Sequence, residues 1–250
     1  MKKFCKIDIT NNNFLFILSN ILRKIIYNSK IIGDVSGYFV CKFQFLLLSF
    51  YKEKSIIDLI RQIRSDVDFA VFPYDAYMIY SLVKTQSKLD GNMAEIGVFQ
   101  GGSAKLICEA KGTRNLYLFD TFEGLQNISD VDTHFGKKFW NENQFNNTDQ
   151  KSVEKFLEKY KNVNVTKGIF PDSAEIIKEL KFSFVHLDVD LYKSTIDCLK
   201  YFYPRLVNGG IILIHDFHTD GIKKAIKDFL VENKVQIIEL SGTQGIILKS

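Results

Sequence analysis

Short apolar runs alternate with amphipathic segments from residue 92 to residue 249, and this alternation restricts the fold more than any other feature of the sequence. The runs expected as strands cover residues 92–97, 115–120, 162–167, 182–188, 210–215, 235–240 and 244–249. The segments expected as helices between them cover residues 102–111, 150–160, 172–180, 194–206 and 220–231. Short buried strands separated by helices predict a parallel, doubly wound α/β sheet.

The final two strands are joined through only four residues, 241–244, the last of which also begins the final strand. Four residues are too few for the crossover helix that two parallel strands require, so these strands must form an antiparallel hairpin. The sequence therefore predicts a seven-stranded, mostly parallel, Rossmann-like sheet with a C-terminal antiparallel hairpin. This order differs from an all-parallel dinucleotide-binding fold.

The first of these strands runs into glycines that open a helix. Gly97 follows the strand, Gly101 and Gly102 precede the helix, and Glu95 and Ser103 flank them. A strand that ends in glycines brings free backbone N–H groups to a helix N-terminus, where an anionic or polar cofactor can bind. Tight packing of the strand on the helix would also explain the glycines.

Asp120 ends the next strand, 25 residues after Glu95, and a carboxylate there can accept two hydrogen bonds from a ribose diol. The two features together indicate a nucleoside-bearing cofactor. The Glu95-x-Gly97 pattern favours S-adenosylmethionine, with Glu95 near its ammonium end and Ser103 near its carboxylate, whereas a nicotinamide site would read GxGxxG. To the same cofactor site we assign Thr121, Phe122, Gly168, Asp172 and Ser173.

Acidic residues and a histidine follow the fourth and fifth strands. Asp188 and Asp190 end one strand, and His215 and Asp216 end its expected neighbour. Because the carboxyl ends of parallel strands meet at one edge, Asp188, His215 and Asp216 should converge beside the cofactor as ligands for a divalent metal. The alternative is that Asp190 or Asp216 caps the following helix.

Residues 124–150 do not fit the alternation. The segment is polar, emerges at the carboxyl edge of the sheet, and carries His134, Phe135, Phe139 and Trp140. A loop of this length inside a compact domain is usually functional or mobile, so we predict a lid, with a disordered surface excursion as the alternative. His134 and His218 are weaker candidates for a base, and both are typical of ordinary surface residues.

Residues 1–55 form a separate N-terminal extension, and residues 56–250 form the catalytic domain. The extension carries nine Lys and Arg against three Asp and Glu, a net charge of about +6. The whole chain has a net charge of +4, so the catalytic domain is slightly negative. We expect an amphipathic helix over 14–32 that ends at Gly33, an apolar stretch of undecided structure over 39–50, and helices over 55–64 and 74–89. The extension can serve packing or self-association into a homo-oligomer, or contact with a membrane surface.

The basic excess lies outside the catalytic domain, which argues against a nucleic-acid partner. No segment reads as a transmembrane helix, because none reaches about 18 apolar residues, and the N-terminus lacks the features of a signal peptide. The four cysteines are far apart and suggest neither a disulfide framework nor a zinc site. We therefore expect a cytoplasmic protein.

Five motifs in order resemble the macrocin/mycinamicin sugar O-methyltransferase family, over about residues 70–250. They are Ala94-Glu-Ile-Gly-Val-Phe-Gln-Gly-Gly-Ser103, Leu118-Phe-Asp-Thr-Phe-Glu-Gly124, His186-Leu-Asp-Val-Asp-Leu-Tyr-Lys-Ser-Thr195, Tyr203-Pro-Arg-Leu-Val-Asn-Gly-Gly210 and His215-Asp216. The resemblance implies a class I S-adenosylmethionine-dependent enzyme that uses Mg²⁺ at Asp188, His215 and Asp216. The family commonly has aspartate at position 215, so His215 can shift the preference toward Mn²⁺ or serve as a base.

The resemblance implies transfer of a methyl group to a hydroxyl of a sugar or a glycosylated small molecule. Asp188 is the first candidate for the base and His215 the second. Three alternatives stay open at this point: a nicotinamide-dependent oxidoreductase on a similar fold, a non-catalytic nucleoside-binding module, and a small-molecule methyltransferase of the catechol type.

Overall fold

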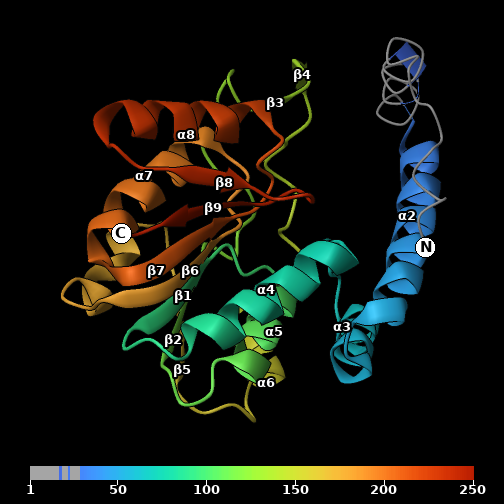
Figure 1. Cartoon of the computed structure of the whole chain (residues 1–250). Coiled ribbons are helices and arrows are strands. Elements are labelled where there is room, and N and C mark those ends of the chain that lie inside the picture. The colour runs from blue at the N-terminus through green and yellow to red at the C-terminus, as the bar shows by residue number, and fades with distance from the viewer. Residues whose placement is uncertain (1–16, 19–21, 23–28) are drawn as a thin grey trace, which may run out of the picture. The chain divides into compact units, whose positions relative to one another are not determined.

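The protein contains a seven-stranded sheet covered by helices on both faces (Figure 1). The structure, a computed structural model, describes residues 17–18, 22 and 29–250. The chain divides into two units, Met1–Lys52 and Glu53–Ser250. The sheet and its helices belong to the second unit.

The strand order in the sheet is β5-β2-β1-β6-β7-β9-β8. The five parallel strands are β1 (Asn92–Ile96), β2 (Leu116–Asp120), β5 (Val163–Lys167), β6 (Phe182–Leu187) and β7 (Leu206–Ile214). The antiparallel hairpin of β8 (Ile237–Glu239) and β9 (Gly245–Leu248) completes one edge. The predicted sheet and its final hairpin are therefore confirmed.

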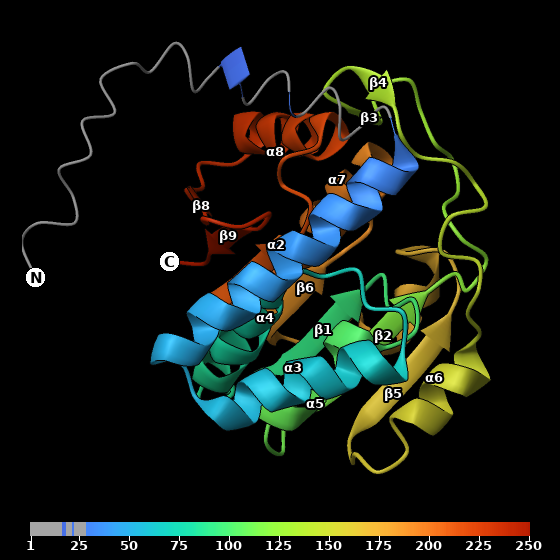
Figure 2. The same cartoon turned by 90° about the vertical axis from the view of Figure 1, so that its right-hand side faces the viewer.

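Helices α4 (Pro73–Gln86) and α5 (Gly102–Ala110) cover one face of the sheet, and α7 (Tyr192–Phe202) and α8 (Asp220–Glu232) cover the other (Figures 1 and 2). Helix α3 (Lys54–Asp66) contacts α4 and α5, and α6 (Gln150–Phe156) lies next to β5. Every residue of β6 is buried, so both faces of the sheet are shielded from solvent at this strand, as expected of a central parallel strand. This core fixes the carboxyl ends of β1, β6 and β7 side by side.

Several predicted boundaries were wrong. The helix expected over 194–206 ends at Phe202, because Pro204 lies in the short 3-10 helix η2 (Tyr203–Arg205), and β7 begins already at Leu206. The segment 172–180 is a 3-10 helix, η1 (Asp172–Ile177), and the side chain of Asp172 makes no capping hydrogen bond there. Helix α6 ends at Phe156, shorter than expected.

The described part of the first unit is dominated by one continuous helix, α2 (Lys30–Tyr51), visible in full in Figure 2. Gly33 was predicted to end a helix but lies inside α2, and the undecided stretch 39–50 is helical. The rest of the helix expected over 14–32 falls mostly outside the described residues.

Residues 31–51 are long and apolar enough to cross a membrane by length and composition, which corrects the expectation that no segment is. The prediction divided this helix at Gly33 because glycine often terminates a helix. A glycine inside a helix costs only about 1 kcal/mol relative to alanine, which a long apolar helix can accommodate.

Candidate active site

The glycine loop after β1 adopts the backbone conformation that its glycines allow. Gly97 and Gly101 both have φ of +84°, and Gly101 is the N-cap of α5. A side chain at Gly97 would collide with the end of β6, because a Cβ atom would lie 1.8 Å from the backbone oxygen of Asp188. The loop after β1 and the end of β6 are therefore packed backbone to backbone.

Asp120 holds this loop from the neighbouring strand. Its Oδ2 accepts hydrogen bonds from the N–H groups of Val98 at 2.7 Å and Phe99 at 2.8 Å, and its Oδ1 accepts one from Phe122 N at 2.7 Å. The charge-assisted bonds to Val98 and Phe99 fix the glycine loop, and the bond to Phe122 fixes the turn after β2. Asp120 was predicted to bind a ribose diol, and this role stays a prediction alongside the positioning role seen here.

Glu95 is completely buried beneath the glycine loop. Its Oε1 lies 2.7 Å from Nδ1 of His186 on β6, a residue that was not among the predicted site residues. Burial raises the pKa of the Glu95 carboxyl, against the lowering effects of His186 and the Ser103 hydroxyl. Oε2 of Glu95 and Nε2 of His186 have no hydrogen-bond partner among the described residues, which is unusual for buried polar atoms.

The other predicted cofactor residues lie at the ends of β2 and β5. Thr121 Oγ1 donates to Gly124 O at 3.1 Å, which closes a turn after β2. Gly168 has φ of +148°, and a Cβ there would lie 2.9 Å from Cβ of Ser173. The Ser173 hydroxyl oxygen is buried without a hydrogen-bond partner among the described residues. Both Ser173 and Glu95 thus carry a free polar atom at positions predicted to meet the cofactor.

Strained backbone gathers at the same edge of the sheet. Four non-glycine residues shortly after β1, β2, β6 and β7 have φ between +50° and +62°: Phe99, Phe122, Asp190 and Asp216. Left-handed conformations are uncommon outside glycine, and where they cluster they often mark functional sites.

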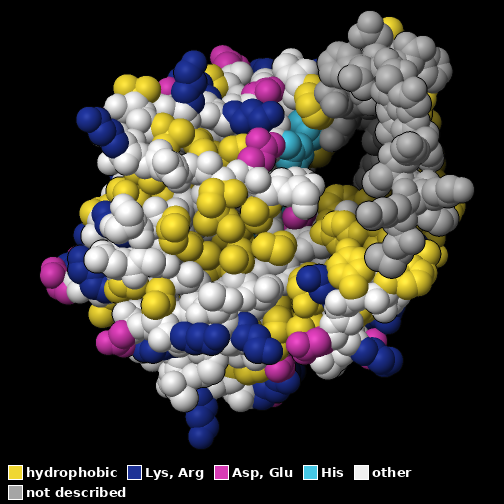
Figure 3. Space-filling view, viewed as in Figure 1, with side chains coloured by type: hydrophobic (Ala, Val, Ile, Leu, Met, Phe, Trp, Pro, Cys, Tyr) yellow, Lys and Arg dark blue, Asp and Glu magenta, His cyan; other side chains and the backbone are white. Residues whose placement is uncertain are grey.

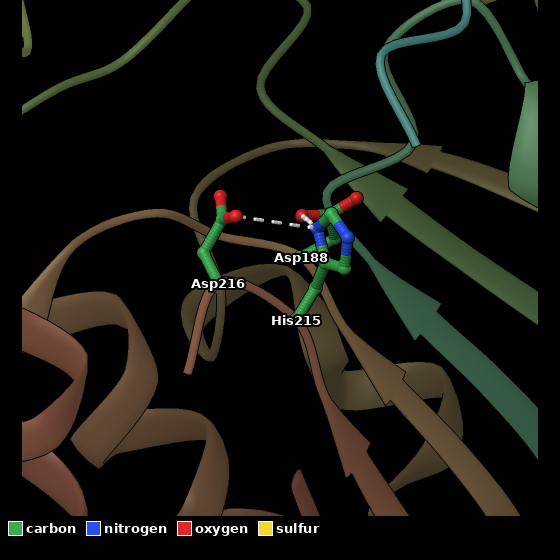
Figure 4. Close-up of side chains that lie close together, drawn as sticks. All are labelled: Asp188, His215 and Asp216. Atoms are coloured by element: carbon green, nitrogen blue, oxygen red, sulfur yellow. Dashed lines mark hydrogen bonds and ion pairs between the residues drawn. The ribbon is translucent and has the colours of Figure 1, made fainter. Parts of the chain in front are cut away.

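Asp188, His215 and Asp216 converge at the ends of β6 and β7 (Figure 4). His215 Nδ1 lies 2.9 Å from Asp188 Oδ1 and 3.8 Å from Asp216 Oδ1. One ligand atom from each residue lies within 4.8 Å of the others. The predicted convergence is therefore present, and two carboxylates with an imidazole are a suitable donor set for a divalent metal.

The charges in this cluster are strongly coupled. Burial would lower the pKa of His215, but the charges of Asp188 and Asp216 outweigh it and raise that pKa to about 10. Burial opposes ionisation of Asp188 as well, yet its pKa is lowered by His215. The neighbouring Asp190 is buried beside both other carboxylates, and burial followed by their repulsion raises its pKa well above the usual range.

Two further residues, Thr243 and Asp75, support the other side of the His215 ring, one by direct contact and one through the first. Neither was predicted from the sequence. Thr243, in the β8–β9 hairpin, has its Oγ1 3.2 Å from His215 Nε2. Thr243 Oγ1 in turn donates to Oδ2 of Asp75 at 2.9 Å, and Asp75 is a buried residue of α4. We name Asp75, Thr243, His215 and Asp188 the histidine relay. It crosses from α4 to the end of β6.

The capping alternative for Asp190 and Asp216 was wrong. The N-cap residues of α7 and α8 are Leu191 and Thr219. Oδ1 of Asp132, a buried lid residue, accepts a hydrogen bond from the N–H of Tyr192 at the start of α7, at 2.7 Å. Asp190 and Asp216 are therefore not needed as helix caps and are available to the acidic cluster.

The predicted lid, residues 124–150, lies along the carboxyl edge and contains a small hairpin of β3 (Thr133–His134) and β4 (Lys137–Lys138). Asp220 on α8 accepts hydrogen bonds from Thr133 Oγ1 and Gly136 N, both at 2.8 Å. At the far end of the lid, Thr148 donates to the backbone oxygen of Phe99 in the glycine loop. The segment is therefore anchored to both halves of the site.

Aromatic side chains of the lid approach the acidic cluster. His134 stacks on Phe135 with ring centroids 4.3 Å apart and meets His218 edge-on at 4.8 Å. His218 Nδ1 lies 3.9 Å from Asp216 Oδ1, and burial lowers the pKa of this histidine. His134 and His218, predicted to be surface residues, thus link the lid to the cluster.

A known family matches the part of the chain that carries this site. The model of the macrocin O-methyltransferase (TylF) family matches residues 80–241, which include β1, β2, β6 and β7 with all the strand-end residues described above. The chain belongs to this family. The resemblance predicted from five motifs is confirmed.

Two curated relatives are similar to this member of the macrocin O-methyltransferase family. One is the 8-demethyl-8-(2,3-dimethoxy-alpha-L-rhamnosyl)-tetracenomycin-C 4'-O-methyltransferase of Streptomyces olivaceus, 28% identical over 61% of this chain and 64% of the relative. The other is the mycinamicin III 3''-O-methyltransferase of Micromonospora griseorubida, 27% identical over 62% of this chain and 67% of the relative. The chain thus spans about two thirds of the relatives it matches.

Solved structures show the same fold. The O-methyltransferase TomG from Streptomyces achromogenes, in complex with SAM, aligns with a TM-score of 0.56 and 13% identity, covering 82% of this chain and 95% of TomG. At this identity the likeness concerns the fold, and it confirms the class I methyltransferase architecture of β1 to β9.

Proposed function

We propose that this protein is an S-adenosylmethionine-dependent O-methyltransferase that methylates a hydroxyl of a sugar or a glycosylated small molecule, assisted by a divalent metal. The observation that carries the proposal is the position of Asp188, which joins the glycine loop through the contact of its backbone with Gly97 and the acidic cluster through its side chain. A methyl donor bound at the glycine loop and a hydroxyl acceptor bound at the acidic cluster would therefore both lie close to Asp188. Family membership favours methyl transfer over a nicotinamide-dependent reaction.

The residues fit the cofactor. S-adenosylmethionine, when bound, supplies a methyl group that is already activated. Glu95 Oε2 and Ser173 Oγ are buried polar atoms without partners among the described residues, as expected where a polar ligand completes the site. The N–H groups at the start of α5 suit its carboxylate. TomG, which shares this fold, was solved in complex with SAM, and this supports the same cofactor here.

Asp188 is the better candidate for the base. The pKa of His215 is raised to about 10, so its ring is protonated at neutral pH and cannot accept a further proton. The pKa of Asp188 is lowered, so its carboxylate is ionised and can accept the proton that the acceptor hydroxyl would lose. The imidazolium beside it stabilises the negative charge until that moment.

A divalent metal also fits the cluster. Burial, followed by the repulsion of Asp216 and Asp188, raises the pKa of Asp190, and a cation would relieve the repulsion. Asp188, His215 and Asp216 would hold the ion. Because a ligand imidazole must be unprotonated, binding of the ion would release the proton that His215 carries in the metal-free cluster. The ion would lower the pKa of the acceptor hydroxyl. The imidazole favours Mn²⁺ over Mg²⁺, which prefers oxygen donors.

The lid supports a sugar-containing acceptor. Phe135 and Phe139 are partly exposed near His134, and the indole N–H of Trp140 is buried without a partner among the described residues. Apolar rings with a few polar groups are typical of sites that bind small molecules. Both relatives are named for the methylation of glycosylated natural products, which agrees with this class of acceptor.

The proposed function can be tested with the full-length protein and methyl-labelled S-adenosylmethionine. We expect label transfer to at least one member of a panel of nucleotide sugars and glycosides, stimulated by Mn²⁺ and reduced by EDTA. S-adenosylhomocysteine should bind and raise the melting temperature, whereas NADH should not. Absence of S-adenosylhomocysteine binding at high micromolar concentration would instead support a non-catalytic module, and methylation of catechols alone would overturn the sugar assignment.

The histidine relay gives a second prediction, which concerns metal affinity. Thr243→Val removes the hydroxyl that holds His215 Nε2, so the ring loses its orientation toward the cluster. Loss of an outer partner of a metal ligand typically weakens binding by about 10- to 100-fold. Titration with Mn²⁺, followed by electron paramagnetic resonance, should show this loss in Thr243→Val.

The matched control is Thr243→Ser, which keeps the hydroxyl and should retain Mn²⁺ affinity within about threefold, well short of the losses expected when an outer partner is removed. Both variants should melt within a few degrees of each other if they differ only in this contact. Equal Mn²⁺ affinity of the valine and serine variants would show that the relay does not position His215.

A further inference from the structure

Helix α2 presents an unusually apolar surface. Its 22 residues give a length of about 33 Å, and the segment 31–51 has a mean hydropathy of 1.4 with only 6% of its most apolar stretch buried. Ten of its large apolar side chains are exposed: Ile31, Ile32, Val35, Tyr38, Phe39, Val40, Phe43, Leu46, Phe50 and Tyr51. A contiguous exposed patch of this kind marks an interaction surface.

The exposed residues follow a helical repeat. Val35, Phe39, Phe43, Leu46 and Phe50 recur every three or four positions, so they share one face of α2. Phe39, Phe43 and Phe50 are 65%, 60% and 73% exposed. We name this set the α2 apolar face. Six of the 22 residues of α2 are aromatic, a composition typical of helices at a lipid interface.

The net charge of the N-terminal part of the sequence indicates the partner of this face. Residues 1–55 carry a net charge of about +6, while residues 56–250 are close to neutral, with 24 Lys and Arg against 26 Asp and Glu. On the side of the Glu53–Ser250 unit shown in Figure 3, positive and negative side chains are interspersed. The excess positive charge therefore accompanies the apolar helix, which is the combination that binds anionic lipid headgroups.

A coiled coil between two copies is less consistent with the sequence. Val40 and Leu47 flank one side of the α2 apolar face and Lys42 the other, so these flanks offer no pair of opposite charges of the kind that usually sets the pairing of two helices. The charges within residues 31–51 are Asp34 and Lys42, and Lys42 lies near the middle of the helix. In a membrane-spanning orientation that lysine would lie near the bilayer centre, where a charge is costly. An orientation in the plane of the surface keeps it near the headgroups.

We propose that α2 attaches the protein to an anionic lipid bilayer, with the α2 apolar face inserted at the boundary between headgroups and acyl chains. Lys42 Nζ lies 5.3 Å from the centroid of the Tyr38 ring and Lys52 Nζ 5.4 Å from that of Tyr51. Cations held over aromatic rings can keep their charge at the headgroup level while the rings lie deeper. This inference does not depend on the proposed methyl transfer.

The test is flotation of the full-length protein with vesicles of phosphatidylglycerol and phosphatidylcholine at a ratio of 3:7, and with vesicles of phosphatidylcholine alone. We expect flotation with the anionic vesicles, several-fold weaker at high salt and with the neutral ones. The triple variant F39S/F43S/F50S should reduce partitioning at least about tenfold. The control V231S/I176S/I238S removes three exposed apolar residues from the other unit and should float like the unaltered protein.

Two results would overturn the proposal. The first is that the unaltered protein fails to float with either vesicle while it binds S-adenosylhomocysteine normally. The second is that the unaltered protein sediments as a dimer, and F39S/F43S/F50S converts it to a monomer with no vesicle binding by either form. Circular dichroism and S-adenosylhomocysteine binding verify that the variants are folded, and the binding also separates failure of this inference from failure of the catalytic one.

Discussion

Replacing Asp188 by asparagine is expected to reduce methyl transfer by about 10²- to 10⁴-fold, the range that a positioned general base contributes. The change removes the carboxylate that is ionised beside His215 and leaves the packing of β6 on the glycine loop in place. Binding of S-adenosylhomocysteine should therefore be largely retained. The measurement is single-turnover transfer from labelled S-adenosylmethionine, paired with calorimetric titration of S-adenosylhomocysteine.

A control for this substitution is Asp197→Asn on α7. Asp197 makes a surface ion pair with Lys193, so the same chemical change there alters charge without touching the site. Asp197→Asn should keep the rate within about twofold, because exposed ion pairs of this kind contribute little. If Asp188→Asn transfers methyl groups as fast as the unaltered protein, Asp188 has no part in the mechanism.

Replacing Gly97 by alanine is expected to have the largest structural effect. A Cβ atom at this position would lie 1.8 Å from the backbone oxygen of Asp188, and the residue has φ of +84°. The left-handed conformation alone costs about 1–2 kcal/mol for a residue with a side chain, and overpacking typically adds about 1–3 kcal/mol. Relief of the clash requires β1 and β6 to separate, which moves Asp188. Both stability and turnover should fall.

Gly112→Ala separates the two causes. Gly112 also has a left-handed backbone, with φ of +60°, but nothing lies within 4 Å of a Cβ built there. The free energy of unfolding of Gly112→Ala should fall by only about 1–2 kcal/mol, the conformational cost, and the turnover should be unchanged. Urea unfolding measures both free energies. A loss in Gly97→Ala no larger than in Gly112→Ala would mean that the contact with Asp188 relaxes without consequence.

The strands along the chain and the final hairpin could be predicted from the sequence because each depends on local information. Strand length, apolar composition and the four residues at 241–244 are enough to define the sheet and its final hairpin. The ends of helices were less predictable, since competing signals meet there. Pro204 ended α7 early, and Gly33 did not end α2.

The strand-end residues of the site were predictable for a topological reason. Parallel strands bring their carboxyl ends together, so Asp188, His215 and Asp216 could be placed side by side from the strand pattern alone. Asp75 and Thr243 could not, because they lie 168 residues apart and neither belongs to a recognisable motif. A weak signal existed only for Thr243, which lies in the tight hairpin beside β7.

His186 was missed for a different reason. It lies within a strand in which every residue is buried, so its sequence context is that of a core residue. Only the structure shows that its ring meets the Glu95 carboxylate in the interior. A polar residue inside an apolar strand run, facing an acid at the same height on the neighbouring strand, is the pattern that would have indicated the pair.

The histidine relay has a consequence for the order in which the chain folds. Asp75 lies in a helix that precedes every strand of the sheet, whereas Thr243 lies in the hairpin that joins the last two. A folding chain can therefore pair the five parallel strands while His215 still lacks the contact that fixes its ring. The relay closes only when β9 pairs with β7, so metal binding should be the last property to appear during refolding.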